Sequence, residues 1–261
     1  QFYYRISDRD IENDYCVADF VFEPIAGNPN RYTLLVGADP QPRAKSKGDD
    51  RVAFHSLDIC EDLYLDMRDT RTAITDREVY GMMLGDIVHE NMALFTNYVA
   101  GIKSTGVQMF NIIGNHDNDK KAANDVEGRH SFEEKLGPTY YSFNIGDVHY
   151  IMLDNIRYRN EKTKKMKKGK YIVGARNYDH VVVEDQLEWL RKDLAMIEDK
   201  NTPIVVGMHS PVFRMLSEHN SRELYSYFHD SEGKRTLPPA LYFASTFAEF
   251  KSVHFVTGHS H

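Results

Sequence analysis

Five short polar clusters in the sequence carry side chains of the kinds that bind divalent metal ions. Each cluster follows an apolar, strand-like run. The clusters are Asp39-Pro40-Gln41, Gly85-Asp86, Gly114-Asn115-His116-Asp117, His209-Ser210-Pro211 and Gly258-His259-Ser260-His261. A single Asp or Asn after a strand is usually turn chemistry or a helix N-cap. Five such clusters in succession are instead typical of a site that binds two metal ions.

The residue types indicate the chemistry of such a site. The candidate ligands are Asp39, Gln41, Asp86, Asn115, His209, His259 and His261. None is a cysteine, which excludes a structural thiolate zinc site. A hydroxide shared by two cations forms near neutral pH and can attack phosphorus. Two divalent ions, two carboxylates and one hydroxide leave about one positive charge, so the site would favour a phosphate oxyanion. The pattern therefore predicts a hydrolase.

Apolar β-rich runs and amphipathic segments alternate along the chain, which predicts an α/β core. The predicted strands cover residues 32–38, 79–84, 107–113, 140–145, 148–153, 204–208 and 253–257, and the clearest predicted helices cover 91–103 and 184–197. The polar clusters follow the carboxyl ends of these strands. Ligands bind at that edge of open α/β sheets because the loops converge there.

Composition limits the class of protein. A chain of 261 residues suits one large domain, and 41% hydrophobic residues suffice for a full core. The net charge of −7 argues against a general nucleic-acid or anionic-membrane partner. No apolar run is long enough to span a bilayer. Cys16 and Cys60 do not form a metal-binding spacing, and the sequence leaves open whether they pair.

Two regions do not fit the predicted core. Residues 1–24 are aromatic and acidic, and we expect them to be a tail or linker from a preceding domain, with one domain over 25–261. Residues 157–170 carry six lysines. They are expected to form a solvated loop, with a basic rim that attracts an anionic substrate as the alternative.

The order of the motifs resembles the calcineurin-like metallophosphoesterases over about residues 31–261. The resemblance rests on Gly85-Asp86, Gly114-Asn115-His116-Asp117, His209 and Gly258-His259-Ser260-His261. It implies a four-layer sandwich in which two mixed β-sheets are flanked by helices.

The resemblance also implies a function for each residue. Asp39 and His261 would hold the first ion, with Gln41 in place of the usual histidine. Asp86 would bridge both ions, and Asn115, His209 and His259 would hold the second. His116 would face the substrate and act on the leaving oxygen, oriented by Asp117.

Gln41 is the main departure from the family pattern. Its amide oxygen is harder than an imidazole nitrogen, so among Mn, Mg, Zn and Fe the first site is expected to favour Mn²⁺ or Mg²⁺. The alternative is that Gln41 is not a ligand.

Gly85-Asp86-Ile87-Val88-His89 contains no tyrosine, which argues against the iron–tyrosinate branch of the purple acid phosphatases. His89, near Asp86, either supports the metal ligands without binding metal itself or is a surface or packing histidine.

We therefore expect a dinuclear metal-dependent phosphoesterase that cleaves phosphomonoesters or small phosphodiesters by attack of a metal-bridging hydroxide. A nuclease of the same fold and a weakly active binding module are the alternatives. The last predicted ligand is also the last residue, so the domain is expected to be incomplete at its C-terminus. Similarity to three-part bacterial proteins implies flanking domains and favours a periplasmic or secreted location.

Overall fold

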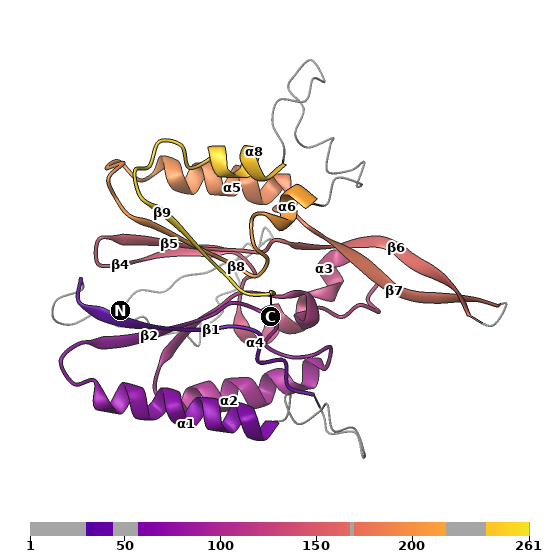
Figure 1. Cartoon of the computed structure of the whole chain (residues 1–261), viewed down its shortest axis with the longest axis horizontal. Helices are drawn as coiled ribbons and strands as arrows, with labels where there is room; N and C mark the ends of the chain where they lie inside the picture. The colour runs from indigo at the N-terminus through magenta and orange to yellow at the C-terminus, as the bar shows by residue number, and fades with distance from the viewer. Residues whose placement is uncertain (1–29, 44–56, 168–169, 218–238, 261) are drawn as a thin grey trace, which may run out of the picture.

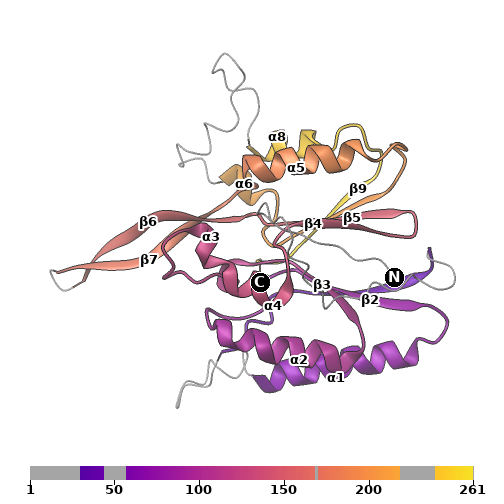
Figure 2. The same cartoon turned by 180° about the vertical axis from the view of Figure 1, so that it is seen from behind.

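The protein is seen here as a computed structural model that describes residues 30–43, 57–167, 170–217 and 239–260 (Figures 1 and 2). The expectations about residues 1–24, Cys16 and His261 lie outside the described residues. Within them, none of the helices has the length and apolar content that crossing a bilayer requires.

The first sheet contains three parallel strands in the order β1-β2-β3. These are β1 (Tyr32–Gly37), β2 (Glu78–Met83) and β3 (Gln108–Asn111). Two helices cover its outer face in Figure 1, α1 (Leu57–Ala73) and α2 (Phe95–Thr105). The predicted helix 91–103 is a short 3-10 turn, η2 (Met92–Leu94), followed by α2. Helix α1 was not predicted, although Cys60, Tyr64 and Met67 have the spacing of a helical face.

The second sheet is mixed and has the order β4-β5-β8-β9. Its strands are β4 (Tyr141–Ile145), β5 (Val148–Leu153), β8 (Ile204–Met208) and β9 (Val253–Thr257). Only the β4–β5 pair is antiparallel. Helices α5 (Glu184–Ala195) and α8 (Pro239–Ser245) cover its outer face (Figure 1), and α6 (Arg214–Ser217) lies beside them.

Side-chain alternation along the strands builds three packed layers of core. In β2 and just beyond it, Tyr80, Met82 and Leu84 pack against Ile145 and Met152 of the second sheet. Met83 points the other way, into the cluster under α1 and α2. A third cluster joins the second sheet to α5 and α8. Because both faces of each sheet are covered, the strands read as continuous apolar runs. The expected four-layer fold is confirmed.

The expectation of a solvated loop at 157–170 is wrong. Strands β6 (Ile156–Lys167) and β7 (Lys170–His180) form an antiparallel hairpin that projects from the sandwich (Figure 1). Pairing the two strands satisfies the backbone polar groups that a loop would leave to water. The base of the hairpin is anchored because Tyr158 is buried and donates its hydroxyl hydrogen to the carbonyl of Asn115 at 2.6 Å.

Three short helical segments lie on the same side as this hairpin. They are η3 (Asn115–Asp117), α3 (Asp125–Gly128) and α4 (His130–Leu136). The first of them is the Asn-His-Asp part of the third polar cluster, so this cluster forms a tight helical turn after β3.

Candidate metal centre

The five polar clusters follow the carboxyl ends of five strands that belong to both sheets. Asp39 follows β1 and Asp86 follows β2, whereas His209 and His259 follow β8 and β9. Contacts join the two groups: the His259 N–H donates to Asp39 Oδ2 at 2.9 Å, and His209 Nε2 lies 3.3 Å from Asp86 Oδ1. The site therefore lies where the ends of the two sheets meet.

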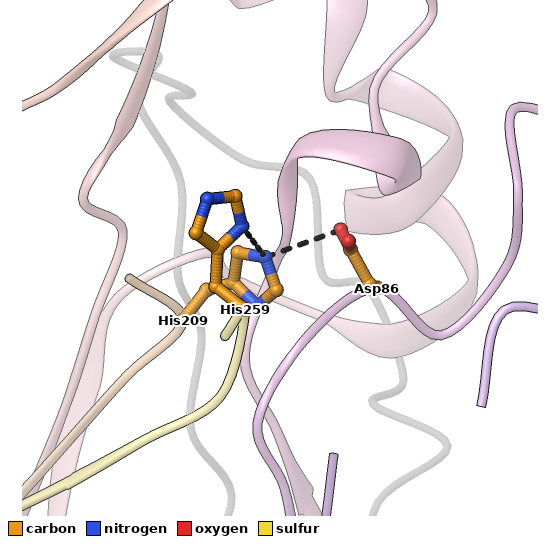
Figure 3. Close-up of side chains that lie close together, drawn as sticks. All are labelled: Asp86, His209 and His259. Carbon is orange, nitrogen blue, oxygen red and sulfur yellow. Dashed lines mark hydrogen bonds and ion pairs between the residues drawn. The ribbon is translucent and has the colours of Figure 1, made fainter. Parts of the chain in front are cut away.

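His209 is the centre of the group (Figure 3). Its Nε2 lies 3.1 Å from Asn115 Oδ1, 3.1 Å from His259 Nδ1 and 3.3 Å from Asp86 Oδ1. Its other nitrogen, Nδ1, donates to the carbonyl oxygen of Leu84 at 2.8 Å. Histidines that bind metals commonly make such a bond, because it fixes the tautomer and leaves the Nε2 lone pair free. The ring is fully buried.

The donor set fits a cation. The facing atoms of Asp86, Asn115, His209 and His259 all carry lone pairs, and Asp86, His209 and His259 offer ligand atoms that lie within 4.8 Å of one another. Such atoms repel one another unless a positive charge lies between them. Burial acts to lower the pKa of His209, but contact with the Asp86 carboxylate outweighs it and raises the pKa. A proton on Nε2 and a metal ion would thus satisfy the same lone pairs.

Both carboxylate oxygens of Asp86 accept hydrogen bonds from neighbouring segments. Its Oδ1 accepts the backbone N–H of His116 at 2.7 Å, and its Oδ2 accepts from Gln41 Nε2 at 2.7 Å. Burial acts to raise the pKa of Asp86, but the bonds from His209 and His116 hold it below its ordinary value. The carboxylate is therefore kept charged, which suits it to bind a cation.

Gln41 is buried and contacts Asp86 through its amide nitrogen rather than its oxygen. The segment is tied to the second cluster by its backbone as well, since Gln41 N–H donates to the Asp86 carbonyl at 3.0 Å. The structure thus shows Gln41 as a hydrogen-bond donor to the central carboxylate.

Backbone strain is concentrated at this site. Among the described residues, the non-glycine residues with positive φ are Asp39 (54°), Gln41 (42°), Asp86 (51°), Glu90 (58°) and His259 (68°). Each such conformation costs on the order of 1–3 kcal/mol and persists only where the surroundings enforce it. Four of the five are predicted ligands, and the fifth, Glu90, contacts the His116 ring.

Steric crowding explains why glycine stands at positions 85 and 114. A Cβ on Gly114 would lie 2.2 Å from the backbone nitrogen and 2.3 Å from the Oδ1 of Asp86. A Cβ on Gly85, where φ is 87°, would lie 2.6 Å from His209 Nδ1. Both glycines let the backbone approach the ligands closely.

The expected contact between His116 and Asp117 is not made in the structure, and that expectation is wrong. Asp117 is buried, and its oxygens accept the N–H groups of Val88 at 2.9 Å and Gly114 at 2.8 Å. Burial and the nearby charge of Asp86 raise its pKa. Its position one residue from His116 suggested the wrong partner, because the tight turn directs the two side chains apart. Asp117 instead holds the backbone of two ligand loops together.

Glu90 contacts His116 in place of Asp117. Its Oε1 lies 3.1 Å from His116 Nδ1, and its backbone N–H donates to the His116 carbonyl at 3.0 Å. Lys120 forms an ion pair with the same carboxylate. Burial lowers the pKa of His116 below its ordinary value, although Asp86 and Glu90 partly oppose this. His116 is therefore mostly neutral near pH 7.

Two more residues of the site had no assigned function in the sequence. The His180 ring, at the end of β7, packs edge-on to the His259 ring with centroids 5.1 Å apart. Asn155, after β5, donates from Nδ2 to the Ser210 carbonyl at 2.6 Å and accepts the Ser210 N–H on Oδ1 at 3.0 Å. Asn155 therefore holds the residue next to His209. The only sequence signal was that both residues stand at strand ends.

An α/β sandwich whose strand ends present carboxylate, amide and imidazole donors to a shared point defines a metal-dependent hydrolase. The chain belongs to the calcineurin-like phosphoesterase family, whose sequence model (Calcineurin-like phosphoesterase) matches residues 60–261. The match begins after Asp39 and Gln41, so the first cluster lies outside it.

Similar proteins agree with this family. The chain is 31% identical over 122 residues to purple acid phosphatase 15 of Arabidopsis thaliana. The aligned region covers 43% of this chain and 19% of that protein. The chain thus matches about a fifth of that relative's length. A dimetal phosphatase from Danio rerio has a similar fold, with a TM-score of 0.55 and 16% identity over 88% of this chain and 82% of that one.

Proposed function

We propose that the protein hydrolyses small phosphate esters, either phosphomonoesters or small phosphodiesters, with two divalent metal ions. The observation that supports this best is the meeting of Asp86, Asn115, His209 and His259 atoms within hydrogen-bonding distances around one buried ring nitrogen. Hydrolases with two metals need such a set together with a group that both ions share.

The residues divide into two ligand groups in this proposal. Asn115, His209 and His259 would hold one ion. Asp39 and His261 would hold the other, with the amide of Gln41 turned so that its oxygen joins them. Asp86 would contact both. Two bound divalent cations would supply an activated water and would draw the phosphoryl oxygens into the site. With a neutral amide in the ligand set, Mn²⁺ or Mg²⁺ is the expected metal beside Gln41.

In its doubly protonated form His116 is the proposed acid for the leaving oxygen; this is the minor form of the free protein near pH 7, and the negative charge of a bound phosphate ester would favour it. The backbone N–H of His116 is bound to Asp86, which fixes its place beside the metal ligands. Its ring is held on the Nδ1 side by Glu90, so Nε2 is the nitrogen left to face the substrate. A positioned proton donor typically contributes on the order of 10²–10⁴-fold in rate.

A metal-supplemented activity panel tests the proposal. Purified protein would be loaded with Mn²⁺, Mg²⁺ or Zn²⁺ and assayed on phosphomonoesters, phosphodiesters, cyclic nucleotides and single-stranded DNA. His209→Ala should abolish turnover, and His130→Ala, at an exposed histidine on α4, should not. Calorimetric titration would count the metal ions. Absence of turnover on every phosphate ester, with one ion or none bound, would support a binding module instead.

A further inference from the structure

A second polar cluster lies beside the metal centre. The His89 and His116 rings are stacked, with centroids 4.0 Å apart and planes at 25°. Beyond His89, the Nη2 of Arg43 lies 3.3 Å from His89 Nδ1. The backbone joins the same two segments, since the His89 N–H donates to the Pro42 carbonyl at 3.3 Å. Arg43 thus lies one stacked ring away from the residue proposed to act on the leaving oxygen.

Arg43 has no acidic partner among the described residues. Its side chain forms no ion pair with any described residue, and the only hydrogen bond recorded for its guanidinium goes to a histidine ring. Its Nε is buried without a hydrogen-bond acceptor in the described part of the chain. A guanidinium with five donors is suited to a planar carboxylate or a phosphate. With most of its donors unused among the described residues, this partly buried arginine is therefore suited to bind an anion.

The cluster suits an anion better than a metal ion. His89, Glu90 and His116 offer possible ligand atoms within 4.8 Å of one another. However, the Glu90 carboxylate is paired with Lys120, and Arg43 already donates to the His89 ring nitrogen. The fixed charges of Arg43, Lys120 and Glu90 sum to one positive charge, which repels a cation and attracts an anion.

We propose that Arg43 binds an anionic substituent on the leaving group, so that the substrate is a phosphate ester whose alcohol carries a carboxylate or a second phosphate. This proposal rests on the function proposed above. His116 is the residue that would face the leaving oxygen. The rest of the leaving group would then extend over the stacked His89 ring to the guanidinium of Arg43.

Binding of phosphonates that cannot be hydrolysed tests the proposal without turnover. Calorimetry on the Mn²⁺-loaded protein would compare propylphosphonate with 3-phosphonopropionate and with propane-1,3-diyl bisphosphonate. Wild type should bind the two compounds that carry a second anionic group about 10- to 100-fold more tightly than propylphosphonate, as expected for charge-assisted hydrogen bonds. The stronger of the two identifies whether a carboxylate or a phosphate is preferred.

Variants connect the preference to Arg43. Arg43→Met should reduce the preference for a second anionic group to about threefold or less, the size expected for a solvent-screened ionic contact. The affinity for propylphosphonate should stay unchanged. Arg43→Lys should retain part of it. Arg68→Met, at an exposed arginine of α1, is the matched control and should behave as wild type.

Two results would overturn the proposal: equal binding of all three compounds by wild type, or equal weakening of all three by Arg43→Met. The second would mean that Arg43 holds the transferred phosphoryl group or the loop itself. If propylphosphonate does not bind at all and the activity panel is also negative, the proposed function fails and this proposal fails with it. A positive panel with no anion preference rejects this proposal alone.

Discussion

Asn155 is expected to control metal affinity although it is not a ligand. Its carboxamide makes two hydrogen bonds with the backbone of Ser210, and both residues are fully buried. Ser210 follows His209, whose Nε2 is the centre of the donor set. Loss of these bonds should release the loop that presents the ring. The ring would then rely on its single bond to the Leu84 carbonyl.

The magnitude follows from what Asn155→Ala leaves behind. One buried N–H and one buried C=O of Ser210 lose their partners, at about 1–3 kcal/mol each, so the free energy of unfolding should fall by about 2–6 kcal/mol. Residues that orient a metal ligand typically affect metal affinity by about 10- to 100-fold. Asn155→Asp should be at least as harmful, because a carboxylate oxygen would then face the Ser210 carbonyl.

Urea unfolding and calorimetric Mn²⁺ titration measure the two effects separately. Asn111→Ala is the control, since it removes a partly buried carboxamide that binds Tyr98 and no metal ligand. It should lower stability while leaving Mn²⁺ affinity within about twofold, a change of well under 1 kcal/mol. If Asn155→Ala is destabilised as expected yet binds Mn²⁺ like wild type, then Leu84 alone holds His209 and the reasoning is refuted. Equal losses of affinity in both variants would show a general effect of stability.

Three further predictions concern single residues. His116→Ala should leave the metal content unchanged and slow turnover of an ester with a poor leaving group by on the order of 10²-fold, with a smaller effect on an activated aryl phosphate; loss of bound metal would make His116 a ligand. Gln41→His should tighten the first metal site and shift its preference towards Zn²⁺, and unchanged calorimetric affinities and metal order would exclude Gln41 from that site. Burial raises the pKa of Asp154 from 3.8 to about 7, so the folded state favours the neutral acid. The free energy of unfolding should therefore fall by up to about 4 kcal/mol as the pH rises from about 4 to about 7. Asp154→Asn should remove that loss and unfold at higher urea concentrations than wild type at pH 8 but not at pH 4; parallel pH profiles would contradict the shift.

The local sequence was sufficient to predict the strands that position most of the site. The predicted strands at 148–153, 204–208 and 253–257 coincide with β5, β8 and β9, because apolar runs bounded by Gly, Asp or Pro leave little choice of start and end. The polar clusters could be located for the same reason, since each stands directly after a strand. That parallel strands would bring these ends together follows from general sheet geometry.

Only the tertiary structure decided which side chains meet. Asp117 is one residue from His116, yet Glu90, 26 residues away, contacts its ring, because the turn after β3 and the loop after β2 pack side by side at the edge of the first sheet. Arg43 and His89 come together in the same way. The lysine-rich segment looked like a loop because its hairpin draws stability from pairing with β7, and cross-strand pairing leaves little trace in local composition. Strand ends depend on neighbours in the chain, whereas partners across loops depend on backbone conformations, such as the positive φ of Glu90, that only the folded surroundings impose.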